Sequence, residues 1–183
     1  MRKTCYTIKE TNELSLREIR TILTHWDVPE WKNMSSEKFR ITFARSEFHL
    51  LTDIDSNILC VARINFRFKI EIRQLVYNIA ELVGLVSIEK GKGYGKKLMS
   101  CIKQNLSKRK IEVIGFCGKE VRPFYKKCGI PVLHDKAKYL VEISGDEKVI
   151  TTDDDILNLS LGSKNFKILQ QLSKTNTGLL LLE

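Results

Sequence analysis

The stretch 89–99 reads EKGKGYGKKLM and places three glycines, Gly91, Gly93 and Gly95, at alternate positions among four lysines. A segment rich in β-branched residues precedes it, and an apolar pattern with helical spacing follows it. A strand, a glycine-rich turn and a helix in this order bind anions, because the open amides of the first helical turn and the helix dipole favour negative charge there. The stretch therefore predicts an anion-binding segment, which we call the glycine loop (residues 89–95).

Spacing excludes two common phosphate-binding signatures for the glycine loop. A Walker A loop needs G-x-x-x-x-G-K-[ST], and no register of the stretch supplies it. A dinucleotide fingerprint needs G-x-G-x-x-G, but Lys96 stands at the final glycine position when the count begins at Gly91.

Length and composition set the general bounds. The chain of 183 residues is long enough to bury a substantial core, and we expect one domain, 1–183. The 31 Lys and Arg residues outnumber the 22 Asp and Glu residues, and this net charge of +9 favours anionic partners. A solvated lysine-rich surface explains the same excess.

Other features of the composition predict a cytoplasmic protein without a membrane partner. No apolar run approaches the length of a membrane span, and no signal-peptide core is visible. The five cysteines are scattered and the three histidines lie far apart, so we expect neither a disulfide framework nor a metal centre.

Hydrophobic periodicity predicts a mixed α/β fold in one piece. Ser15 and Glu18 have the spacing of a capping box at the start of the first helix. The expected helices are 16–26, 31–40, 98–106, 122–127 and 163–172, and the expected strands are 5–9, 48–52, 58–66, 75–87, 111–117, 139–143 and 149–152. The apolar residues 179–182 are interpreted only as a tail.

Two motifs carry a resemblance to a known family. The residues KGKGYG at 90–95 resemble [RQ]-x-x-G-x-[GA], the pyrophosphate-binding signature of the GNAT superfamily of acyl-CoA N-acetyltransferases, with Lys90 in place of Arg or Gln. The residues RPFYKKCGI at 122–130 look like the F-Y-E-K-x-G-[FW] segment of the same superfamily, with Ile130 in place of a bulky aromatic residue. The resemblance covers about 45–131, and 132–183 is expected to complete the sheet.

The resemblance implies a fold and a cosubstrate. The implied fold is a mixed, mostly antiparallel central sheet flanked by helices, with two splayed central strands. The implied cosubstrate is acetyl-CoA, whose pantetheine arm lies against the backbone of Leu85, with Gly84 easing a bulge. The implied cofactor-binding residues are Leu85, Val86, Lys90, Gly91, Lys92, Gly93, Tyr94, Gly95 and Lys96.

The resemblance also implies catalytic residues. Tyr125 stands where family members carry a general-acid tyrosine that protonates the departing thiolate, and a packed aromatic residue is the alternative. Glu81 stands where several members carry the base that takes the amine proton, here through water, and a solvent-facing strand carboxylate is the alternative. Cys117 and Cys128 are interpreted as structural, because no paired His accompanies them.

The acceptor is the least specified part of the prediction. In this fold the segment between the first two helices lines the acceptor groove, and here it supplies Trp26, Asp27 and Trp31. Aromatic and acidic residues together suit a cationic amine, although they also occur as ordinary packing and surface residues. The expected partner is a small-molecule or protein amine, and the resemblance allows a homodimer.

The predicted function is therefore transfer of an acetyl group from acetyl-CoA to a primary amine by direct attack. Two alternatives remain open at this point. One is a catalytically inactive acyl-CoA-binding sensor with the same fold. The other is a basic nucleic-acid-binding module, which the absence of aromatic residues between the lysines makes the weaker of the two.

Overall fold

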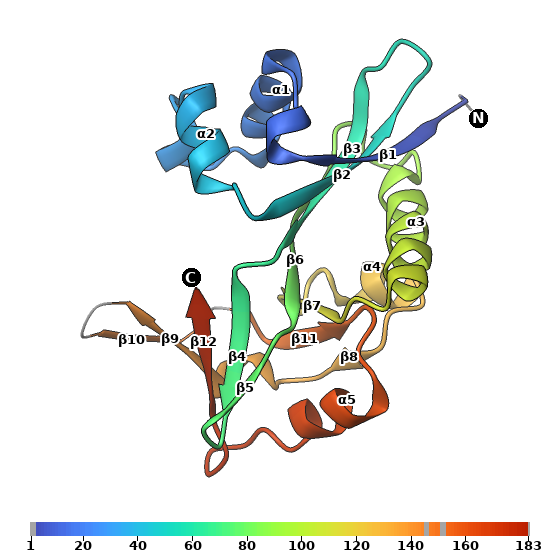
Figure 1. The fold of residues 1–183 in the computed structure, drawn as a ribbon. Coiled ribbons are helices and arrows are strands. Elements are labelled where there is room, and N and C mark those ends of the chain that lie inside the picture. Colours follow the sequence, from blue (N-terminus) through green and yellow to red (C-terminus); the bar gives the residue numbers. More distant parts are fainter. Residues whose placement is uncertain (1–2, 145–146, 151–152, 183) are drawn as a thin grey trace. The chain divides into compact units, whose positions relative to one another are not determined.

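The computed structural model describes residues 3–144, 147–150 and 153–182 (Figure 1). The chain is organised in two compact units. Unit 1 comprises the chain up to Asn65 together with Val83–Ile102, and unit 2 comprises Phe66–Leu82 and the chain from Lys103 onward. The single domain expected from the sequence stays a prediction.

Unit 1 combines an antiparallel set of strands with two helices. Its elements are β1 (Cys5–Glu10), the 3-10 helix η1 (Thr11–Glu13), α1 (Leu16–Trp26), the 3-10 helix η2 (Pro29–Trp31), α2 (Ser36–Thr42), β2 (Ser46–Thr52), β3 (Ile58–Asn65), most of β6 (Ala80–Ser87) and the first half of α3 (Tyr94–Arg109). The predicted capping box of α1 is confirmed, because the Ser15 hydroxyl accepts from the Glu18 amide and the Glu18 carboxylate accepts from the Ser15 amide.

The prediction for the second helix is wrong at its start. Residues near Trp31 form a 3-10 turn after Pro29, and the helix begins only at Ser36, where the Ser35 side chain accepts a hydrogen bond from the Lys38 amide. A local serine cap therefore sets the start of α2, since it satisfies an amide that the helix leaves open.

Unit 2 carries the remaining strands and two short helices. Its elements are β4 (Phe68–Ile72), β5 (Leu75–Tyr77), the first residues of β6, the end of α3, β7 (Val113–Cys117), α4 (Arg122–Lys127), β8 (Val132–Leu133), the 3-10 helix η3 (Ala137–Tyr139), β9 (Leu140–Ser144), β10 (Glu147–Ile150), β11 (Asp155–Asn158), α5 (Ser163–Gln170) and β12 (Gly178–Leu182). The helix predicted at 122–127 is confirmed, and residues 151–152 of the last predicted strand lie outside the described residues.

The strands form two sheets. A seven-stranded sheet has the order β1-β2-β3-β6-β7-β11-β8. In it β6 pairs parallel with β7, and the pairs β1–β2, β2–β3, β7–β11 and β11–β8 are antiparallel. A five-stranded sheet has the order β10-β9-β12-β4-β5. The prediction of a mixed, mostly antiparallel central sheet with flanking helices is confirmed.

Three details of the strand prediction are corrected. The segment 75–87 is two strands, β5 and β6, rather than one. Residues 179–182 are not a tail, since they pair with β4 on one side and β9 on the other. Among the described residues after 131, only β8 and β11 complete the central sheet, whereas β9, β10 and β12 belong to the second sheet.

Each unit has its own apolar core. Unit 1 packs five aromatic rings together, those of Trp26, Trp31, Phe39, Phe43 and Phe48. Unit 2 packs β4, β7, β9, β11 and β12 around a core of mostly Ile and Leu side chains. In the part of the chain that the structure describes, no helix is both long and apolar enough to cross a membrane.

Candidate functional site

The glycine loop adopts the backbone conformation that its glycines allow. Gly91 and Gly93 both have φ of +77°, in the left-handed region that residues with a Cβ avoid. A Cβ built at either position would meet no atom within 4 Å. The loop therefore needs glycine for its backbone path, and the space beside both residues is open.

The amides of the glycine loop are available to a ligand. The first helical bond of α3 joins the Lys97 amide to the Gly93 carbonyl at 3.1 Å, and no hydrogen bond to another described residue is made by the amides of 91–96. The first turn of α3 holds no acidic residue that could serve as an internal anion. Such a run of open amides at the start of a 16-residue helix has the donor arrangement for a phosphate group.

Three lysines border these amides. Lys90, Lys92 and Lys96 are exposed, and among the described residues none of them pairs with a carboxylate. Lys97 differs, because its ammonium donates to the Thr4 hydroxyl. The three lysines therefore place positive charge beside the open amides, and no carboxylate of the described residues neutralises it.

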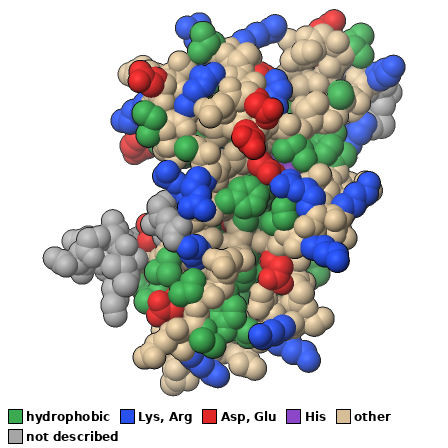
Figure 2. Space-filling view, viewed as in Figure 1, with side chains coloured by type: hydrophobic (Ala, Val, Ile, Leu, Met, Phe, Trp, Pro, Cys, Tyr) green, Lys and Arg blue, Asp and Glu red, His purple; other side chains and the backbone are tan. Residues whose placement is uncertain are grey.

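On the face drawn in Figure 2, basic side chains do not gather at one place. Figure 2 shows Lys and Arg side chains at many separate positions on the face drawn, with apolar and acidic groups between them. The glycine loop is distinguished by its open amides rather than by positive charge alone.

The strand that leads to the glycine loop carries the predicted pantetheine contact. Pairing of β6 with β7 joins 80–82 to 113–115. Leu85 and Val86, both half-buried, lie further along β6, past the residues that pair with β7. Gly84 just before them has φ of +67°, in the left-handed region, and the bulge at this residue stays a prediction.

Trp26, predicted as an acceptor contact, packs on this same strand. Its Nε1–H donates to the Gly84 carbonyl at 2.7 Å, and its ring lies against Trp31 with centroids 5.6 Å apart. Trp31 also makes an edge contact with Phe43. Both indoles thus belong to the aromatic core of unit 1, and their role toward an acceptor stays a prediction.

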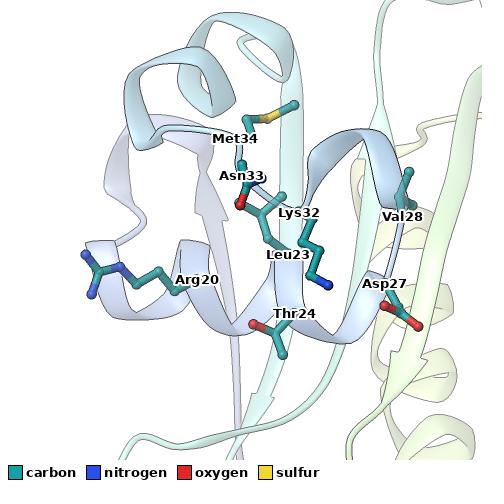
Figure 3. A pocket seen from close by; sticks show the side chains of 8 residues that line it. All are labelled: Arg20, Leu23, Thr24, Asp27, Val28, Lys32, Asn33 and Met34. Atoms are coloured by element: carbon teal, nitrogen blue, oxygen red, sulfur yellow. The ribbon is translucent and has the colours of Figure 1, made fainter.

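Asp27, the third predicted acceptor residue, borders a surface hollow of about 480 Å³. The residues that line it are Arg20, Leu23, Thr24, Asp27, Val28, Lys32, Asn33 and Met34 (Figure 3). Asp27 ends α1 in the left-handed conformation, with φ of +51°, and the side chain of Arg20 points away from the others. The hollow therefore brings a carboxylate and the Lys32 ammonium to one surface of unit 1, together with apolar side chains.

Tyr125 lies in the middle of α4, a helix of six residues. Burial, with smaller contributions from Cys117, Cys128 and Asp153, raises the pKa of Tyr125 above its ordinary value. The hydroxyl is therefore protonated at neutral pH, and it makes no hydrogen bond to another described residue. Such a phenol can donate a proton to a ligand atom.

The turn after Tyr125 is closed by a Schellman motif. Gly129 has φ of +66°, its amide donates to the Lys126 carbonyl, and the Ile130 amide donates to the Tyr125 carbonyl at 3.1 Å. Ile130 is 3% exposed. Isoleucine therefore fills the place at which the family pattern has a bulkier aromatic residue.

Cys117, one of the two cysteines near Tyr125, is poorly suited to covalent catalysis. Cys117 is buried on β7, and burial raises the pKa of its thiol to about 11. The reactive thiolate is then a minor species at neutral pH. A covalent route through Cys117 is therefore disfavoured, and direct attack stays a prediction.

Glu81, the predicted base, is half-buried on β6 opposite Ile114 of β7. Its strand neighbours Ala80 and Leu82 are buried, so the alternation of the strand directs Glu81 to the other face of the sheet. Its catalytic role stays a prediction.

A charged pair at the start of α4 had no role in the sequence prediction. Arg122 donates to the buried carboxylate of Asp155 through Nε at 2.5 Å and Nη2 at 2.9 Å. The two residues are 33 positions apart, and only the pairing of β11 with β7 brings them together. No local pattern in the sequence could have indicated this contact.

Comparisons with known proteins place the fold. Neither the protein-family models nor the curated proteins include a match to the sequence. Among solved structures, a GNAT family N-acetyltransferase (YhbS) from Escherichia coli in complex with CoA superposes with a TM-score of 0.63 at 11% identity, covering 100% of this chain and 91% of that one. The catalytic domain of the Tetrahymena GCN5 histone acetyltransferase in complex with coenzyme A superposes with a TM-score of 0.53 at 17% identity, covering 87% and 94%.

A third structure, Escherichia coli ElaA, superposes with a TM-score of 0.55 at 12% identity and covers 85% of this chain and 99% of that one. Identities this low report the fold alone. The sheet order, the glycine loop before α3 and these superpositions together lead to one conclusion. The chain has the fold of the GNAT superfamily of acyl-CoA N-acyltransferases.

Proposed function

We propose that this protein transfers an acetyl group from acetyl-CoA to a primary amine. One observation carries the proposal: the amides of 91–96 make no hydrogen bond to another described residue at the start of α3, and three exposed lysines, Lys90, Lys92 and Lys96, lie beside them. This donor set fits a diphosphate, which is the part of coenzyme A that carries the negative charge. The cofactor-bound neighbours with the same fold support the choice of coenzyme A.

In the proposed reaction the amine nitrogen attacks the thioester carbonyl carbon, and the carbon–sulfur bond breaks. Tyr125 gives its phenolic proton to the departing sulfur, and Glu81 receives the amine proton, here through a water molecule. The pantetheine arm pairs with the backbone of Leu85 and Val86, as an added strand pairs with a sheet edge. We keep Trp26, Asp27 and Trp31 as the proposed acceptor contacts.

Calorimetric titration with acetyl-CoA tests the proposal. The expected Kd lies at roughly micromolar level for the unmodified protein, and Gly93→Glu is expected to abolish binding because its carboxylate would enter the phosphate position. The matched control is Gln104→Glu, an exposed position on the same helix with the same change of charge, and it should bind normally.

Release of free thiol with a panel of primary amines then tests the chemistry. Binding that Gly93→Glu removes, without thiol release for any amine, would assign the protein as an acyl-CoA sensor. Absence of binding by the unmodified protein would overturn the proposal.

A further inference from the structure

We propose that the Arg122–Asp155 ion pair positions α4 so that the Tyr125 hydroxyl points to its site of action. The inference rests on the proposed function in one respect, namely that Tyr125 is the group that acts. All the contacts that carry it lie within unit 2.

Helix α4 is too short to be held by its own hydrogen bonds. With six residues α4 is far below the length at which a helix is stable alone in water, and no side chain caps its N-terminus. Pro123 in its first turn has no amide to donate. Contacts outside the helix must therefore hold it in place.

Hydrogen bonds hold both ends of α4. At the C-terminal end, the Schellman motif closes the last turn, and the Lys103 ammonium donates to the Gly129 carbonyl at 2.6 Å. At the N-terminal end, Arg122 is the first helical residue, and its guanidinium makes the two bonds to Asp155. The helix is thus held by hydrogen bonds at both ends, and Arg122 makes the side-chain contact at its start.

Asp155 holds the Arg122 side chain in a fixed place. Asp155 is 0% exposed, lies opposite Cys117 in the pairing of β11 with β7, and also accepts the Asp135 amide at 2.9 Å. A carboxylate with three donors on a sheet strand is a rigid point of attachment. A planar guanidinium with two parallel bonds also fixes direction, which a lysine cannot do.

The position of Tyr125 depends on the Arg122–Asp155 ion pair through the helix. Arg122 and Tyr125 are three residues apart, so they lie on neighbouring parts of one helix face, and a rotation of α4 moves both. The Tyr125 ring contacts the adjacent Phe124 at 5.1 Å between centroids, and its hydroxyl bonds to no other described residue. The direction of the hydroxyl therefore follows the position of the helix.

The kinetic test is a double-mutant cycle. Arg122→Lys keeps the charge and removes the paired geometry, and it should lower kcat by about 10- to 100-fold while the Kd for acetyl-CoA changes less than about twofold. In a Tyr125→Phe background, Arg122→Lys should lower kcat only slightly further, because the hydroxyl that the ion pair positions is already absent. An equal loss of kcat in both backgrounds would overturn the inference.

A second readout does not depend on activity. In protein labelled with 3-fluorotyrosine, the ¹⁹F resonance of Tyr125, one of five tyrosines, is assigned by its loss in Tyr125→Phe. Arg122→Lys and Asp155→Asn should shift or broaden this resonance. Lys119→Met should not, since Lys119 pairs with Asp135 and Asp154 at an exposed position outside α4.

The two readouts separate the two proposals. A changed resonance in a protein that transfers no acetyl group would support the positioning pair and refute the proposed function. Acetyl transfer by the unmodified protein, together with an unchanged Tyr125 resonance in Arg122→Lys, would support the proposed function and refute the positioning role of the ion pair.

Discussion

The indole nitrogen of Trp26 donates to the carbonyl of Gly84 at 2.7 Å, which joins the end of α1 to the strand that precedes the glycine loop. Gly84 has φ of +67°, and a Cβ at this residue would lie 2.6 Å from Trp26 Nε1. The contact is therefore possible only with glycine on the strand. It makes a core residue of unit 1 a support for the proposed pantetheine-binding strand.

Gly84→Ala should lower the free energy of unfolding by about 2–4 kcal/mol, because it adds both a left-handed alanine and an overlap with the indole. Gly91→Ala is the matched control, since Gly91 also has positive φ but faces open space. It should cost only the backbone strain, about 1–2 kcal/mol. Urea denaturation of both variants measures the difference. Equal losses of unfolding free energy would show that the indole moves aside without an energetic penalty.

Trp26→Phe should cost about 1–2 kcal/mol of unfolding free energy, because the Gly84 carbonyl loses its donor. Trp31→Phe is the control, since no hydrogen bond to a described residue is made by the Trp31 indole. We also expect Trp26→Phe to weaken acetyl-CoA binding in calorimetry, because Gly84, which precedes Leu85, loses its hydrogen bond to the indole. Unchanged affinity would separate the Trp26 contact from the cofactor strand.

Tyr125→Phe should lower kcat by about 10²–10⁴-fold with acetyl-CoA affinity nearly unchanged, because only the proton donor is removed. Steady-state kinetics with calorimetry on the same preparation measure both quantities. Tyr139→Phe, a tyrosine of η3 in the same unit, should behave like the unmodified protein. Full activity of Tyr125→Phe would show that another group protonates the thiolate.

The pH profile of kcat should rise as the acceptor amine loses its proton and should show no falling limb below about pH 10. The sign follows from Tyr125: a general acid acts while protonated, and burial raises its pKa, so the active form persists to higher pH. Rates from pH 6 to pH 10 provide the measurement. A decline near pH 8 would point to a different acid.

Asp155→Asn should lower the free energy of unfolding by about 3 kcal/mol at pH 7, because Arg122 loses its buried partner. Burial acts to raise the pKa of Asp155, but hydrogen bonds from Arg122 and the Asp135 amide outweigh it, and the pKa lies below its ordinary value. The stabilisation from Asp155 is therefore complete above about pH 4 and is lost as pH falls through the lowered pKa. Denaturation at pH 7 and below pH 4 should show the gap between the two proteins narrowing in acid, and a constant gap would contradict this.

The sequence by itself determined the elements whose signals are local. The capping box at Ser15 set the start of α1, and the glycines at alternate positions set the backbone path of the glycine loop, because both depend on residues a few positions apart. The order of the two motifs was enough to indicate the fold and to select Tyr125. The period-2 pattern of β4 is equally local, although the predicted strands do not include 68–72.

Only the tertiary structure decided the contacts between distant segments. Residues 179–182 became a strand because β4 and β9 offer two edges to them, and a short apolar run contains no signal for such partners. The same holds for Trp26 with Gly84 and for Arg122 with Asp155, whose partners lie 58 and 33 residues away. Packing and strand register bring these pairs together, and neither is readable from the spacing of residues along the chain.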